Sequence, residues 1–162
     1  GLGCIAGDRK ARQWMSHVTG LLLDVGCGNQ QWRRSVPDSA RYIPLDCCSI
    51  ASLYHFGQQP PQINADGCAL PVKSDAIGGI ISPFVVEHVP EPAKLVSEAS
   101  RVLRSGGYFI LLGPGDVCPT HGEPYNYYNL TRFGYRDLLE RTSFEVIEEY
   151  YPSRSWSSIA FL

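Results

Sequence analysis

The stretch Leu-Leu-Leu-Asp-Val-Gly-Cys-Gly, residues 21–28, decides the fold. Its first five residues form a short and mostly apolar run, which is typical of a strand buried on both faces of a parallel sheet. Gly26 and Gly28 follow this run, and glycine permits both a tight turn and a close approach of the backbone to a ligand. The stretch therefore predicts a central strand that ends in a loop able to contact a bound molecule.

Strand-like and helix-like segments alternate along the rest of the chain. We expect further strands at residues 41–45, 62–65, 75–82, 108–112 and 144–151, and helices at residues 8–18, from about residue 92 to the glycines at 106–107, and at 131–141. Residues 152–162 fit either a seventh strand or the start of a helix. This alternation predicts an α/β fold with a doubly wound, mainly parallel sheet in three layers. A length of 162 residues fits one domain, residues 1–162.

Composition and charge exclude several classes of protein. Hydrophobic residues make up 44% of the chain and charged residues 19%, with a net charge of −2, so we expect neither disorder nor a nucleic-acid partner. No apolar run reaches the about 18–20 residues that span a bilayer, and residues 1–20 lack the apolar core of a signal peptide. The six cysteines form no C-x-x-C pair and match no histidine cluster, which predicts free thiols, no metal site and a cytoplasmic location.

Acidic and glycine-rich residues stand where the predicted strands end. Asp24 precedes the glycine loop, Asp46 and Asp66 follow the next two strands, and residues 82–88 follow the fourth. Ligands of doubly wound sheets bind outside the carboxyl ends of the strands. Any one of these acids could instead cap a helix or lie in a solvated loop, but their shared position predicts a binding site.

A dinucleotide cofactor is the less favoured ligand. The dinucleotide fingerprint needs a third glycine three residues after the second one, and Gln31 stands there. An adenosine ligand without phosphates needs only the close approach that Gly26 and Gly28 allow.

Five motifs in order resemble those of class I S-adenosylmethionine-dependent methyltransferases. They are LLDVGCG at 22–28, the strand at 42–46 that ends in an acid, DGCALPV at 66–72, the stretch 75–89 that ends in Glu-His-Val, and Glu98 with RVLRSGG at 101–107. The resemblance implies a Rossmann-like methyltransferase fold and S-adenosylmethionine as cofactor, with S-adenosylhomocysteine as product.

The resemblance also implies roles for individual residues. Asp46 would accept from the ribose hydroxyls, Asp66 from the adenine amino group, and Asp24 would face the methionine part. The full set of cofactor-binding residues that we expect is Asp24, Gly26, Cys27, Gly28, Asp46, Cys47, Asp66, Gly67, Cys68 and Pro83.

His88 and His121 are the candidate catalytic bases for the acceptor. The string HGEPYNYY at 121–128 is similar to a segment of methyltransferases of surface-glycan biosynthesis, with Asn126 and Asn129 in place of an acid and a basic residue. We therefore expect methyl transfer to a small molecule or a glycan. The alternative is a non-catalytic methyltransferase-like module that acts with a partner protein, and a homodimer is also compatible with the sequence.

Overall fold

A seven-stranded sheet forms the centre of the computed structural model, which describes residues 2–47, 60–115, 118–151 and 155–162. The strands are β1 (Gly20–Val25), β2 (Ala40–Asp46), β3 (Ile63–Asn64), β4 (Ile77–Pro83), β5 (Leu103–Pro114), β6 (Glu145–Tyr150) and β7 (Ser155–Phe161). Their order is β3-β2-β1-β4-β5-β7-β6. The first five strands in this order run parallel, and β7 pairs antiparallel with both β5 and β6. The predicted doubly wound, mainly parallel sheet is confirmed.

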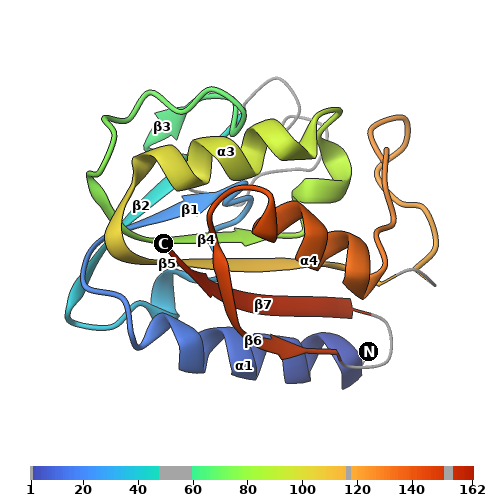
Figure 1. Cartoon of the computed structure of the whole chain (residues 1–162), viewed down its shortest axis with the longest axis horizontal. Coiled ribbons are helices and arrows are strands. Elements are labelled where there is room, and N and C mark those ends of the chain that lie inside the picture. The colour runs from blue at the N-terminus through green and yellow to red at the C-terminus, as the bar shows by residue number, and fades with distance from the viewer. Residues whose placement is uncertain (1, 48–59, 116–117, 152–154) are drawn as a thin grey trace.

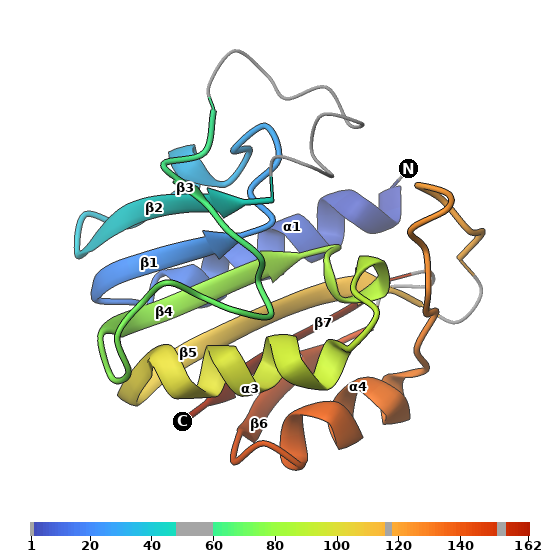
Figure 2. The ribbon, with the colours of Figure 1, turned by 90° about the horizontal axis from the view of Figure 1, so that it is seen from above.

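Helices cover both faces of this sheet, as Figures 1 and 2 show. Helix α1 (Leu2–Met15) lies on one face, and α3 (Pro92–Val102) and α4 (Arg132–Glu140) lie on the other. Two short 3-10 helices, η1 (Arg33–Ser35) and η2 (Val86–His88), follow the ends of β1 and β4. The three predicted layers are therefore present. Within the described residues, each helix is too short or too polar to cross a bilayer.

Each face of the sheet carries its own apolar core. Helix α1 packs Trp14 and Met15 against Leu22 of β1 and Ile110 of β5. On the other face, the apolar stripe of α3 and the inner side of α4 pack against β4 and β5, with Leu95, Val96, Ala99, Val102, Tyr135 and Leu139 all buried. A stripe of this spacing is what an amphipathic helix buries on a sheet.

The two glycines of β4 are explained by close packing. A Cβ atom at Gly78 would lie 1.8 Å from the carbonyl oxygen of Thr19, and one at Gly79 would lie 2.5 Å from Val18 Cγ1. All seven residues of β4 are buried, so no larger side chain fits at either position.

Two segments differ in extent from the sequence expectation, and a third, for which strand and helix were both open, is a strand. Helix α1 begins at Leu2 and ends at Met15, rather than spanning 8–18. Strand β5 begins at Leu103, so residues 105–107 lie inside it; its pairing with β4 shifts register there, where Gly106 adopts a φ of +79°. The last segment is a strand, because β7 completes hydrogen-bonded pairs with both β5 and β6.

Candidate functional site

A cavity of about 280 Å³ opens at the carboxyl ends of β1, β2 and β4. Eight of the residues singled out from the sequence line it: Gly26, Gly28, Asp46, Cys47, Asp66, Gly67, Cys68 and His88. Apolar side chains complete the wall, among them Leu45, Phe84, Val85 and Val89. A mostly apolar cleft with a few convergent polar groups is the usual form of a small-molecule site.

Asp46 joins the end of β2 to the glycine loop after β1. Its Oδ2 atom accepts a hydrogen bond of 2.8 Å from the Gly28 N–H, and its Oδ1 atom accepts one of 2.7 Å from the Cys47 N–H. A carboxylate oxygen has more than one lone pair, so each can accept a further bond. The carboxylate is thus fixed in place at the cavity wall.

The glycine loop has positive backbone φ angles and leaves no room for a larger side chain at Gly26. Gly26 has a φ of +74°, and a Cβ atom there would lie 2.1 Å from Val85 Cγ2. Gln30 also adopts a positive φ of +57°, which is uncommon for a residue other than glycine. Its buried side chain donates to the Pro60 carbonyl over 2.9 Å and accepts from Arg33. These contacts hold Gln30 in a conformation that glycine would adopt more easily.

Asp66 also lines the cavity and lies in the segment that follows β3. Its Oδ1 atom accepts a 2.8 Å hydrogen bond from the Cys68 N–H. A Cβ atom at Gly67 would lie 2.7 Å from Leu95 Cδ1, so this segment packs directly on α3. The turn therefore holds the Asp66 carboxylate at the cavity.

Glu98 and Arg101, part of the fifth motif, support the same segment from α3. Glu98 accepts from the Leu70 N–H over 2.7 Å. Arg101 donates to the carbonyls of Leu70 and Val72 over 3.0 and 2.9 Å, and pairs with Glu98. Neither side chain lines the cavity. These two motif residues therefore anchor the segment at residues 70–72 to α3 rather than contact a ligand in the cavity.

Asp24, Cys27 and Pro83 lie behind the cavity wall and do not line it. The Asp24 side chain is fully buried and accepts a hydrogen bond from the Tyr42 hydroxyl. Burial raises the pKa of Asp24 to about 7, although the Tyr42 hydrogen bond opposes this shift. Cys27 is also buried, and its thiol lies 3.9 Å from the Gly28 carbonyl oxygen.

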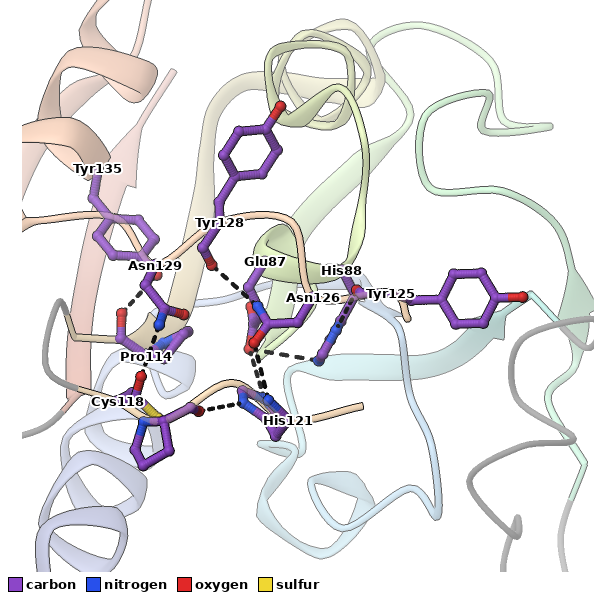
Figure 3. Close-up of polar contacts among 11 residues, drawn as sticks. Glu87, His88, Pro114, Cys118, His121, Tyr125, Asn126, Tyr128, Asn129 and Tyr135 are labelled. Atoms are coloured by element: carbon purple, nitrogen blue, oxygen red, sulfur yellow. Dashed lines mark hydrogen bonds and ion pairs between the residues drawn. The ribbon is translucent and has the colours of Figure 1, made fainter. Parts of the chain in front are cut away.

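His88 and His121 come together around a buried carboxylate, that of Glu87 (Figure 3). Their rings meet edge to face with centroids 4.9 Å apart. The Oε1 atom of Glu87 lies 3.6 Å from His121 Nε2 and 3.8 Å from His88 Nε2. Burial raises the pKa of Glu87 to about 8 and lowers the pKa of His88 below its usual value.

Asparagine side chains shape the loop that carries His121. Asn126 accepts from the His121 N–H over 3.0 Å, and Asn129 donates to the Cys118 carbonyl over 2.7 Å. The Tyr128 hydroxyl donates to the Pro90 carbonyl over 2.9 Å, which ties the loop to the segment before α3. The two asparagines therefore hold the loop closed on itself.

A family model described as a methyltransferase domain matches residues 23–111, from β1 to β5. The match covers more than half of the chain. The chain belongs to this methyltransferase domain family. The family predicted from the five motifs is thereby confirmed.

Individual relatives agree with this assignment. The methyltransferase domain is 29% identical over 134 residues to a probable S-adenosylmethionine-dependent methyltransferase of Mycolicibacterium smegmatis, covering 77% of this chain and 52% of that protein. The chain spans about half the length of the curated relatives it matches.

Solved structures share the fold at low sequence identity. The crystal structure of a SAM-dependent methyltransferase from Archaeoglobus fulgidus superposes with a TM-score of 0.75 at 14% identity, covering 99% of this chain and 94% of that one. The structure of the Burkholderia thailandensis 1,6-didemethyltoxoflavin-N1-methyltransferase, with bound 1,6-didemethyltoxoflavin and S-adenosylhomocysteine, superposes with a TM-score of 0.73 at 14% identity. The superposition covers 96% of this chain and 78% of that one. The predicted Rossmann-like methyltransferase fold is confirmed.

Sequence reasoning missed Glu87 and Tyr42. Glu87 stands in the quoted Glu-His-Val motif, but only its neighbour His88 was singled out there. Tyr42 stands in the second-strand motif, and only the packing of β1 beside β2 brings its hydroxyl to Asp24. The apolar cavity residues Phe84 and Val85 had no polar signal in the sequence.

Proposed function

We propose that this domain binds S-adenosylmethionine in the cavity after β1, β2 and β4 and transfers its methyl group to a small-molecule or glycan acceptor. The observation that carries the proposal is the Asp46 carboxylate, which two backbone N–H groups fix at the cavity wall, with Asp66 on the same wall.

The donor and acceptor groups of the wall fit a nucleoside without phosphates. Asp46 would accept from the two ribose hydroxyls and Asp66 from the adenine amino group. The described lining residues include these two carboxylates and no Lys or Arg, a charge distribution that opposes a pyrophosphate. Cys47, Gly67 and Cys68 would flank the nucleoside, and Gly26 and Gly28 would offer backbone to the remainder of the cofactor.

Three further residues of the expected site have indirect roles in this proposal. Asp24, Cys27 and Pro83 lie behind the wall, so they would support the loop and the end of β4 rather than contact the cofactor. S-adenosylmethionine supplies a methyl group that is already activated on a sulfonium. The protein's main task is then to align the acceptor, and such positioning supplies roughly 7–11 kcal/mol in favourable cases.

The acceptor would enter beside His88 and the loop that carries His121. His88 lines the cavity, and either histidine is placed to remove or share an acceptor proton. The rings of Tyr127 and Tyr128 are 46% and 38% exposed with centroids 6.5 Å apart, so they offer apolar faces to a flat ligand or a sugar ring. The Burkholderia methyltransferase of similar fold binds 1,6-didemethyltoxoflavin, which supports the small-molecule part of the proposal.

A methyl-transfer assay tests the proposal. The purified domain is incubated with methyl-labelled S-adenosylmethionine and separate pools of glycans and small aromatic or hydroxylated molecules, and label in each acceptor is measured. We expect label in one pool, and much less label with Asp46→Ala when the cofactor concentration is close to the wild-type dissociation constant. Cofactor binding without transfer to any pool would instead favour the non-catalytic module.

A further inference from the structure

The cluster of Glu87, His88 and His121 has a buried acid at its centre. The Glu87 side chain is fully buried, and neither of its carboxylate oxygens has a hydrogen-bond partner among the described residues. A buried carboxyl group without hydrogen bonds is costly in its charged form, so such a group stays neutral unless it is paired with a charge or coordinates a metal. Among the described residues, Glu87 forms ion-pair contacts with the imidazoles of His121 and His88, at 3.6 and 3.8 Å. These separations exceed a hydrogen bond.

The hydrogen bonds of the two histidines orient the same ring nitrogen toward Glu87. His88 Nδ1 lies 2.8 Å from the Tyr125 carbonyl oxygen, and His121 Nδ1 lies 3.3 Å from the Pro119 carbonyl oxygen. A carbonyl only accepts, so each Nδ1 carries the proton and each Nε2 presents its lone pair on the side of Glu87. Metal-binding histidines usually donate their second ring N–H to a carbonyl or carboxylate in this way.

The spacing of the three groups fits one ion. One ligand atom from each residue lies within 4.8 Å of the others. Metal–ligand bonds of about 2.0–2.2 Å place neighbouring ligand atoms about 3.0–3.5 Å apart, so small side-chain movements would bring all three atoms into contact with a central ion.

We propose that Glu87, His88 and His121 form a binding site for a divalent transition-metal ion at the edge of the cofactor cavity. Two imidazoles and one carboxylate suit zinc or ferrous iron, whereas magnesium and calcium prefer oxygen ligands alone. Three protein ligands leave at least one coordination position open. No local motif reveals this site, because 33 residues separate the two histidines and only the loop over η2 joins them.

A bound ion would replace the histidines as the group that activates the acceptor. With Nε2 on the metal and Nδ1 bonded to a carbonyl, neither ring keeps a nitrogen for proton removal. An acceptor hydroxyl in the open position would release its proton to water at a lower pH than it does when free. This role rests on the proposed function, but binding of the metal rests on the cluster alone.

Metal titration in the absence of S-adenosylmethionine tests the site separately from methyl transfer. The domain is freed of metal with a chelator and titrated with Zn²⁺ by calorimetry and with Co²⁺ by visible absorption. We expect one ion per chain and a cobalt spectrum without the charge-transfer band of thiolate ligands. Glu87→Gln and His121→Ala should each weaken binding by about 10-fold or more, at least the loss that follows removal of a single supporting hydrogen bond at a metal site.

The matched control is His17→Ala, because the His17 ring lies beside Tyr108, away from the cluster. It should bind both ions as the wild type does. If Glu87→Gln does not fold, as judged by circular dichroism, metal binding by His121→Ala tests the proposal. The His121 side chain is 42% exposed, so its replacement leaves the core intact. Absence of saturable binding in the folded wild type, or unchanged binding in His121→Ala, would overturn the proposal.

Discussion

Asp46 at the end of β2 holds the backbone of Gly28 in the loop after β1, through a 2.8 Å hydrogen bond from the Gly28 N–H to Asp46 Oδ2. Strands β1 and β2 are parallel neighbours, and their register places Val25 beside Leu45, just before the loop and Asp46. The acid that would bind the ribose therefore also sets the shape of the loop that would contact the rest of the cofactor.

Asp46→Ala should weaken S-adenosylmethionine binding by about 1.5–3 kcal/mol, the range for hydrogen bonds to a charged group. The fold should survive, because Asp46 stands at a half-buried strand end. Calorimetric titration measures the change, with the exposed Asp38→Ala as the matched control. An unchanged dissociation constant in folded Asp46→Ala would refute the ribose assignment.

His121→Ala should leave S-adenosylmethionine affinity within about 0.5 kcal/mol, as expected for a residue outside the binding contacts. His121 does not line the cavity, and its loop contacts η2 and the segment before α3. Calorimetric titration with S-adenosylmethionine measures the affinity of the variant. Loss of cofactor binding in a folded His121→Ala protein would make the loop part of the cofactor site.

Gly26→Ala should destabilise the fold more than Gly28→Ala does. Both glycines have positive φ, which costs an L-residue roughly 1–2 kcal/mol. A Cβ atom at Gly26 would in addition lie 2.1 Å from Val85 Cγ2, and such overpacking costs about 1–3 kcal/mol more, whereas a Cβ atom at Gly28 has nothing within 4 Å. Chemical denaturation measures both free energies of unfolding. The double variant Gly26→Ala/Val85→Ala should be less unstable than the two single changes added together, and strict additivity would show that the contact is absent.

Asp24→Asn should change how stability depends on pH. Burial raises the pKa of Asp24 from 3.8 to about 7 in the folded protein, so the folded state binds one more proton than the unfolded state between these values. Stability then falls as pH rises across this window, by about 1.4 kcal/mol per pH unit for one proton. Asn cannot titrate, so the Tm of Asp24→Asn minus that of the wild type should increase from pH 5 to pH 7. A difference that stays constant would mean that Asp24 is charged throughout.

The strand ends could be predicted because they depend on local sequence. The apolar runs predict buried strands, and Gly26, Asp46 and Asp66 follow them directly. Parallel pairing then brings the carboxyl ends of these strands to the same edge of the sheet. The last strand, β7, which lies between β5 and β6, was harder to predict. Residues 152–162 have no periodic pattern that separates strand from helix, and their state depends on pairing with β5.

The cluster around Glu87 could not be predicted from local sequence. Its members come from η2 and from an irregular loop more than thirty residues later, and the loop's path depends on hydrogen bonds from Asn126, Asn129 and Tyr128. The burial of Asp24 could not be predicted either, because an acid at the end of a strand is typical of a ligand contact. Only the neighbouring strand shows that Asp24 pairs with the Tyr42 hydroxyl.

The central claim is that the cavity holds a nucleoside cofactor without phosphates, and calorimetric titration of the domain with S-adenosylmethionine, S-adenosylhomocysteine and NAD tests it most directly. We predict saturable binding of the first two at one molecule per chain, with no binding of NAD, because the wall carries Asp46 and Asp66 and no Lys or Arg among its described residues. Binding of NAD in place of the two sulfur compounds, or binding of none of the three by the folded domain, would contradict the account.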